Sequence, residues 1–176
     1  MPRPSEHQAN FVEYLVGLSD RENRGALAAL RRGVGKPPGT VPETFPIMVP
    51  WTGSLKSRRE ADCYFLVGAL FALHPQNTTQ GNMGTTFALM PDPSDSLEKR
   101  FVALLNADAE DLRNHLRHAV SLAGSKEVPV NWAQLLADLR HWDHPDRFVQ
   151  RDWAEQYWGH SQPAEDEGTT EPTGSE

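Results

Sequence analysis

The fold is decided by one stretch near the amino terminus, Ser19-Asp20-Arg21-Glu22-Asn23-Arg24-Gly25-Ala26-Leu27-Ala28-Ala29-Leu30-Arg31-Arg32-Gly33. Ser19 and Glu22 have the spacing of a capping box, in which each side chain satisfies a free backbone N–H of the first helical turn. Alanine and leucine, which are good helix formers, fill the centre. Gly33, Gly35 and the pair Pro37-Pro38 then favour termination. The stretch therefore predicts an α-helix with its own start and stop signals.

This helix is predicted to separate its charges from its leucines. At about 100° per residue, Leu27, Leu30 and Val34 share an arc of about 60°. The four arginines lie on a second arc, about 100° wide, that points away from the first: Arg21, Arg24, Arg31 and Arg32. A guanidinium matches two phosphate oxygens with its fork of donors. Because only Glu22 accompanies the arginines, we predict that this face binds a polyanion. The alternative is an ordinary solvated helix face.

Charge is unevenly distributed along the chain of 176 residues, whose net charge is −7. Residues 160–176 contain five acidic residues and no lysine or arginine, and without them 17 basic and 19 acidic residues leave a net charge of −2. The window 21–59 has eight basic and two acidic residues, a net charge of +6. Local potential governs contact with a polyanion, so the acidic sum does not exclude nucleic acid as a partner.

The cysteine count and the length of the apolar runs favour a cytoplasmic protein without a membrane span. Cys63 is the only cysteine, which excludes an intrachain disulfide. The longest apolar run, Tyr64 to Leu73, is about half the length of a membrane span, and the amino terminus lacks a signal-peptide pattern. We expect a soluble cytoplasmic protein.

Apolar spacing predicts an all-α protein made of two small helical bundles packed together, with no β-sheet. Besides the opening stretch, helices are predicted over 6–18, 58–73, 95–105, 108–124, 132–142 and 145–157. The helix over 58–73 is apolar on almost every side and is expected to be central and buried. Prolines make 36–56 an irregular loop against the core, and 75–95 reads as a loop with one helical turn near 87–89. We predict an N-terminal helical lobe over 1–93, a C-terminal bundle over 94–159 and an acidic disordered tail over 160–176.

The start of the central helix is a second candidate anion site. Arg58 and Arg59 follow Ser57, at the end where the helix dipole disfavours cations. Free N–H groups and two arginines together suit a phosphate, although two solvent-facing arginines are an equal alternative. Trp51, in the proline-rich segment, is a candidate for stacking on a base.

No catalytic or metal centre emerges from the sequence, and no cofactor is expected. His115 and His118, like His141 and His144, are spaced by three, but a metal site needs three or four ligands. Cys63 lies in the predicted buried helix, where a thiol behaves as a small hydrophobe. We therefore expect a protein that is not an enzyme.

Four pieces of the sequence together resemble the small subunit of the type I-E CRISPR Cascade surveillance complex, the CasB family. The first piece is the stretch from Asp20 to Gly33, and the second runs from Ala69 to Pro75. The third is Arg100-Phe101 with Leu104-Leu105, and the fourth runs from Trp132 to Trp142 and is followed by Trp153-Ala154. In order and spacing they cover most of residues 11–158, while the acidic tail lies outside the pattern.

The resemblance implies an all-helical, non-catalytic subunit that enters the complex as two copies joined end to end. Its partners would be the guide RNA, the target DNA, a second copy of itself and the backbone and large subunits of Cascade. It would hold the displaced strand and so stabilise the R-loop. The family's basic surface maps here onto Arg24, Arg31 and Arg32, and further onto Arg21, Lys36, Arg58 and Arg59, with Lys126, Arg147 and Arg151 as weaker candidates.

The basic face suggests sequence-independent contact with the nucleic-acid backbone, and the resemblance implies that this contact serves antiviral defence. Base pairing supplies sequence in guide-directed recognition, so a few phosphate contacts suffice. The rival is a helical protein-interaction subunit without direct nucleic-acid contact, whose arginines pair with the acids of a partner. Charge reversal at Arg24, Arg31 and Arg32 is expected to flatten the salt dependence of oligonucleotide binding without changing the thermal melt.

Overall fold

The computed structural model describes residues 1–159, which form nine α-helices and one short 3-10 helix, with no β-strand among them. The helices are α1 (Glu6–Asp20), α2 (Arg24–Arg31), α3 (Phe45–Thr52), α4 (Arg58–Leu73), α5 (Met83–Ala88), α6 (Asp95–Asn106), α7 (Leu112–Ser125), α8 (Trp132–Leu139) and α9 (Phe148–Trp158), and η1 (Pro42–Thr44) is the 3-10 helix. The all-α prediction is confirmed. No helix in this part of the chain is long and apolar enough to cross a bilayer.

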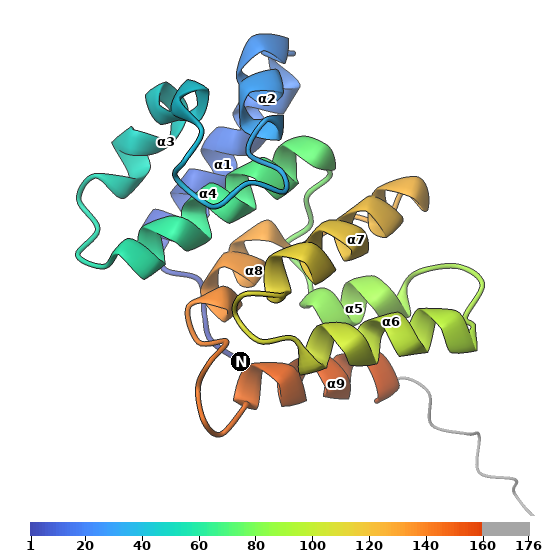
Figure 1. Cartoon of the computed structure of the whole chain (residues 1–176). Coiled ribbons are helices and arrows are strands. Elements are labelled where there is room, and N and C mark those ends of the chain that lie inside the picture. Colours follow the sequence, from blue (N-terminus) through green and yellow to red (C-terminus); the bar gives the residue numbers. More distant parts are fainter. Residues whose placement is uncertain (160–176) are drawn as a thin grey trace, which may run out of the picture.

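Helices α1 to α4 gather at one end of the molecule and α5, α6 and α9 at the other, with α7 and α8 between them (Figure 1). Helix α4 contacts α2, α3, α7 and α8, as expected of a central helix, and α8 also contacts α1. Helix α5 packs most closely on α9. The division into lobes at residue 93 stays a prediction, and the predicted tail over 160–176 lies outside the described residues.

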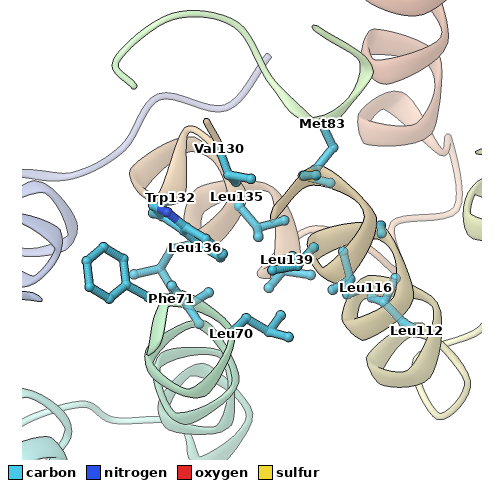
Figure 2. Close-up of a cluster of buried hydrophobic side chains, with 14 of the residues drawn as sticks. Leu70, Phe71, Met83, Leu112, Leu116, Val130, Trp132, Leu135, Leu136 and Leu139 are labelled. Atoms are coloured by element: carbon cyan, nitrogen blue, oxygen red, sulfur yellow. The ribbon is translucent and has the colours of Figure 1, made fainter. Parts of the chain in front are cut away.

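One continuous hydrophobic core joins the two ends. Leu70 and Phe71 of α4 point toward Trp132 and Leu136 of α8, and Leu116 of α7 belongs to the same cluster (Figure 2). Trp132 and Trp153 are fully buried and Trp142 nearly so, and all three pack in the core. The core orders α4 and α7, the two helices that carry most of the site described below.

The start of α2 differs from the prediction. Helix α1 continues through Ser19 because Leu15 and Leu18 are buried along it, so Ser19 does not cap the next helix. The chain reverses at Glu22, which has a left-handed φ of 52°. Asn23 is the N-cap instead, and its side-chain oxygen accepts a hydrogen bond from the Ala26 N–H at 3.1 Å. The predicted capping box was wrong, although the helix after it exists.

The proline-rich segment is partly helical rather than irregular. Pro42 begins η1 and Pro46 lies in the first turn of α3, where the missing N–H has no intrahelical partner to lose. Pro50 lies within α3, close to its carboxyl end. Met48 is fully buried against α4, close to Gly68. The prediction of a loop was wrong for 42–52, and the prediction that the segment packs on the core is confirmed.

The segment 75–95 contains the helix α5, where a loop with one turn near 87–89 was predicted, so that prediction was wrong for 83–86; Asn82 caps α5 by accepting from the N–H groups of Gly84 and Thr85. The other helices start and end within a few residues of their predicted limits. Ser57 caps α4 through the Glu60 N–H, and Asn131 caps α8 through the Gln134 N–H. The side chain of Asp108 accepts from the N–H groups of Glu110 and Asp111, so it forms a turn before α7 instead of capping it. Helix α9 begins after Arg147 and not at Pro145.

Candidate nucleic-acid interface

Helix α2 separates charge from apolar side chains as the sequence predicts. Leu30 is fully buried and Leu27 packs against the core, while Arg24, Arg31 and Arg32 are exposed. The face is not wholly free, because an Arg32 Nη1 atom lies 3.2 Å from a carboxylate oxygen of Glu43 on η1. An exposed pair of this kind contributes little stability and is easily exchanged for a phosphate.

Arg21 does not belong to this face. It follows the last turn of α1, and its guanidinium lies back along that helix, 3.2 Å from where a Cβ would stand on Gly17. The cause is the reversal at Glu22, which separates Arg21 from the register of α2. Placing Arg21 on the arc of the other three arginines was therefore wrong.

Trp51 is engaged in an aromatic cluster at the end of α3. Its ring lies 5.6 Å from Phe11 and 5.3 Å from Tyr14 of α1, measured between ring centroids. Its carbonyl oxygen lies 2.9 Å from His7 Nε2. These contacts dock α3 onto α1, and they account for Trp51 without a base to stack on.

At the start of α4, both arginines lie close to acidic residues. Arg59 forms an ion pair with Asp143, which follows α8. The neighbouring Glu60 pairs with Arg140, with 3.3 Å between the nitrogen and the oxygen. Arg58 is exposed and lies close to Asp62. The helix terminus is therefore partly neutralised and is not a purely basic site.

A groove runs from these arginines between α4 and α7 and is covered on one side by the loop 33–41. Its wide end is a cavity of about 570 Å³ lined by Arg58, Arg59 and Arg113 among others. Its narrow end is a cavity of about 170 Å³ lined by Lys36, Arg113 and Arg117 among others. Arg113, Pro37 and Leu66 line both cavities, so the two lie next to each other. We call the surface formed by Lys36, Arg58, Arg59, Arg113 and Arg117 the basic groove.

The loop lies very close to α7 at the narrow end. Gly35 has a left-handed φ of 75°, and a Cβ on it would stand 3.1 Å from Arg117 Nη1. Glycine adopts this φ at little cost, which lets the backbone approach the guanidinium. The turn at Gly35 therefore brings Lys36 toward Arg113 and Arg117.

Positive charge is unbalanced at the narrow end and balanced at the wide end. Asp62, Glu110 and Asp143 line the wide cavity, whereas no acidic residue from the described part of the chain lines the narrow one. Burial raises the pKa of Asp62, while the guanidinium groups of Arg58 and Arg113 oppose that shift. The strongest attraction for a phosphate is therefore expected around Lys36, Arg113 and Arg117.

Two residues of the basic groove were missed from the sequence. Arg113 lies three residues after Glu110, a spacing that predicts an ordinary surface pair, but the described residues show no ion pair between them. Arg117 was not singled out. The available signal was their spacing of four on one helix, which puts both side chains on the same face of α7.

The weaker candidates lie away from both cavities of the basic groove. Lys126 lies 3.8 Å from a carboxylate oxygen of Asp92. Arg147 donates to the Leu105 carbonyl oxygen, and Arg151 is exposed on α9. Nothing in their described surroundings gathers them into a common surface.

The described residues contain no group of three histidine, cysteine or acidic side chains able to hold a metal ion. Burial raises the pKa of Cys63 to about 11, so its sulfur is a thiol at neutral pH. His74 is buried, with Nε2 2.7 Å from the Val128 carbonyl oxygen. His115 and His118 line a cavity of about 410 Å³ with Arg100, and the described residues that line it include no nucleophile beside them.

Comparison with known proteins identifies the family. Residues 26–158 match the family model for the CRISPR-associated protein Cse2. The chain belongs to the Cse2 family. A curated Cse2 protein from Thermus thermophilus is 36% identical over 152 residues, which cover 85% of this chain and 88% of the relative.

Solved structures of Cse2-family proteins share the fold. CasB from Thermus thermophilus superposes with a TM-score of 0.77 at 34% identity, over 86% of this chain and 97% of that one. M. ruber CasB gives a TM-score of 0.74 at 30% identity, over 89% and 94%. A chain of a CRISPR RNA-guided surveillance complex gives 0.76 at 26% identity, over 86% and 91%.

Proposed function

We propose that this Cse2-family chain is a non-catalytic subunit of a cytoplasmic CRISPR RNA-guided surveillance complex. Within it, the basic groove and the exposed arginines of α2 would contact nucleic-acid phosphates. The observation that carries the proposal is the narrow end of the groove, where Lys36, Arg113 and Arg117 converge without an acid from residues 1–159. A relative within a surveillance complex supports the setting.

Such contacts would act on the R-loop through its backbone. The exchange of a DNA duplex for a guide–target hybrid is nearly balanced in free energy. A modest number of protein–phosphate contacts therefore changes the fraction of target DNA that is held in the R-loop. Guanidinium groups in a groove suit a single strand that follows it. We propose that the displaced DNA strand occupies the groove and that the guide RNA, the target strand, a second copy of the chain and the backbone and large subunits lie around it.

The rival function is that of a helical interaction subunit that contacts only protein. Two observations favour it: Arg32 and Arg59 already pair with acids of the same chain, and α3 has no charged residue and exposes Phe45 and Val49. An apolar, uncharged surface of this kind suits a protein partner. The salt dependence of oligonucleotide binding separates the two functions.

The test is a titration of a labelled mixed-sequence oligonucleotide at several salt concentrations. Each phosphate contact contributes a slope of about 0.7 for single strands and about 0.9 for duplex DNA in a plot of log affinity against log salt. We expect the double variant Arg113→Glu, Arg117→Glu to lose about two such contacts. Charge reversal of Arg24, Arg31 and Arg32 is expected to flatten the slope further.

The matched control is Lys99→Glu, an exposed lysine of α6 outside the groove. It should leave the slope unchanged, and thermal melts should show that all variants are folded. If both groove and α2 variants keep the slope of the original chain, the nucleic-acid contact lies elsewhere. If no form binds the oligonucleotide at low salt, the protein-only role is favoured.

A further inference from the structure

We infer that residues 160–176 form an internal competitor that occupies the basic groove when nucleic acid is absent. The inference rests on the proposed function, because it concerns the surface that would bind phosphates and names what binds there when nucleic acid is absent. Its physical basis is charge complementarity: this segment has five acidic residues and no lysine or arginine. Guanidinium groups bind carboxylates with the same forked geometry that they use for phosphates.

The segment is an addition to the family pattern rather than a part of it. The match to the Cse2 family model ends at residue 158, one residue before the end of the described part of the chain. It contributes −5 of the net charge of −7. An electrostatic role therefore explains its composition without requiring that it belong to the common fold.

The segment starts where it can reach the groove. Helix α9 ends at Trp158, whose ring lies 5.5 Å from Phe101 of α6, and α6 packs against α7, the helix that carries Arg113 and Arg117. An extended chain spans about 3.4 Å per residue, so residues 160–176 extend to about 58 Å at most. A domain of this length is about 40 Å across. Attachment to the same chain also gives the acids a local concentration in the millimolar range.

The narrow end of the groove is the favoured place of contact. Arg32 on α2 and Arg59 at the wide end each have an acidic partner already. Lys36, Arg113 and Arg117 line a cavity that no acid of the described chain shares. Carboxylates from the segment would meet the least balanced positive charge there, and salt would weaken the contact.

The first experiment compares three chains for binding to a labelled single-stranded DNA of mixed sequence at low salt. They are the full chain, a chain ending at Gly159, and a full chain with all five acids neutralised (Glu165→Gln, Asp166→Asn, Glu167→Gln, Glu171→Gln and Glu176→Gln). We expect both altered chains to bind about three- to tenfold more tightly than the full chain, with the difference fading as salt rises. Equal affinity of the three chains would overturn the inference.

A second experiment tests the contact without DNA, so that failure of the proposed function does not obscure it. A labelled peptide of residues 160–176 is titrated against the chain ending at Gly159, and fluorescence anisotropy reports binding. We expect binding that is lost in the variant Arg113→Gln, Arg117→Gln and kept in Lys99→Gln. If the peptide binds but DNA does not, the proposed function fails alone. If DNA binds and the peptide does not, or binds both variants equally, the inference fails alone.

Discussion

At the scale of single residues, Asp138 is the most unusual titratable group among the described residues. Its side chain is buried in α8, where it accepts hydrogen bonds from Gln134 Nε2 at 2.8 Å and Trp153 Nε1 at 2.7 Å. Burial raises its pKa from 3.8 to about 7, although both hydrogen bonds favour the ionised form. Gln134 also donates to the Pro2 carbonyl oxygen, so Asp138 connects the amino terminus, α8 and α9.

The raised pKa makes stability depend on pH in a definite direction. Between about pH 4 and pH 7 the folded chain keeps a proton that the unfolded chain releases, so the free energy of unfolding falls as pH rises through this range. The contribution of this group is on the order of 4 kcal/mol over the whole range. Urea unfolding from pH 5 to pH 8 should show the fall.

The variant Asp138→Asn separates this effect from other titrations. An amide has one acceptor oxygen, so the variant loses one hydrogen bond and is expected to be less stable at pH 5. Because it does not titrate, the gap to the original chain should narrow toward pH 8. Glu13→Gln, on the exposed side of α1, is the control and should leave the pH profile unchanged. A constant gap across the range would show that Asp138 is ionised throughout.

At the scale of elements, the closest helix pair is α5 on α9. A Cβ on Gly84 would stand 1.9 Å from the Trp153 carbonyl oxygen, which no relaxation of a side chain relieves. Gly84→Ala should force the two helices apart and lower the free energy of unfolding by about 3 kcal/mol, the upper range for overpacked cores. Chemical denaturation measures the loss.

The matched control is Gly25→Ala in the first turn of α2. A Cβ there would meet only Asn23 Oδ1 at 3.9 Å, an ordinary contact. The exchange should be neutral or stabilise the chain by up to about 1 kcal/mol, since alanine favours the helix. A Gly84→Ala chain as stable as the original would mean that α5 shifts without cost.

The elements also show which parts of the structure local sequence can predict. The helices over 58–73 and 132–142 were predictable because their own apolar residues bury them, and the polar residues just before them, Ser57 and Asn131, are their N-caps. Ser19 was misleading because the burial of Leu18 extends α1 past it, a tertiary effect that no capping pattern records. In the site, Lys36 and Arg58 were predicted, whereas Arg113 and Arg117 became visible only when the fold placed α7 beside the loop 33–41. The surface is assembled by packing between segments far apart in the sequence.

At the scale of the whole molecule, the basic groove depends on how the N-terminal helices pack on α7. Arg58 and Arg59 start α4 and Lys36 precedes α3, in the part drawn in blue and green, while Arg113 and Arg117 belong to α7 (Figure 1). The ion pair between Arg59 and Asp143 also joins α4 to the segment that follows α8. The position of α4 and the loop 33–41 relative to α7 therefore sets the shape of the groove, and any loosening between them would separate its cations.

The shared core predicts that the two ends unfold together. Leu70 and Phe71 of α4 are buried against α8, so separating the ends would expose a large apolar surface. Pulsed hydrogen exchange across a urea titration reports one unfolding midpoint for peptides from α1–α3 and another for peptides from α6 and α9. We expect these two midpoints to coincide. Met48→Ala, which empties a buried position in α3, should lower both midpoints together by the equivalent of about 2–5 kcal/mol. Val49→Ala, on the exposed side of the same helix, should change neither by more than about 0.5 kcal/mol. The opposite result would be two different midpoints, of which Met48→Ala lowers only that of α1–α3. It would mean that the ends are independent domains and that the groove opens when they separate.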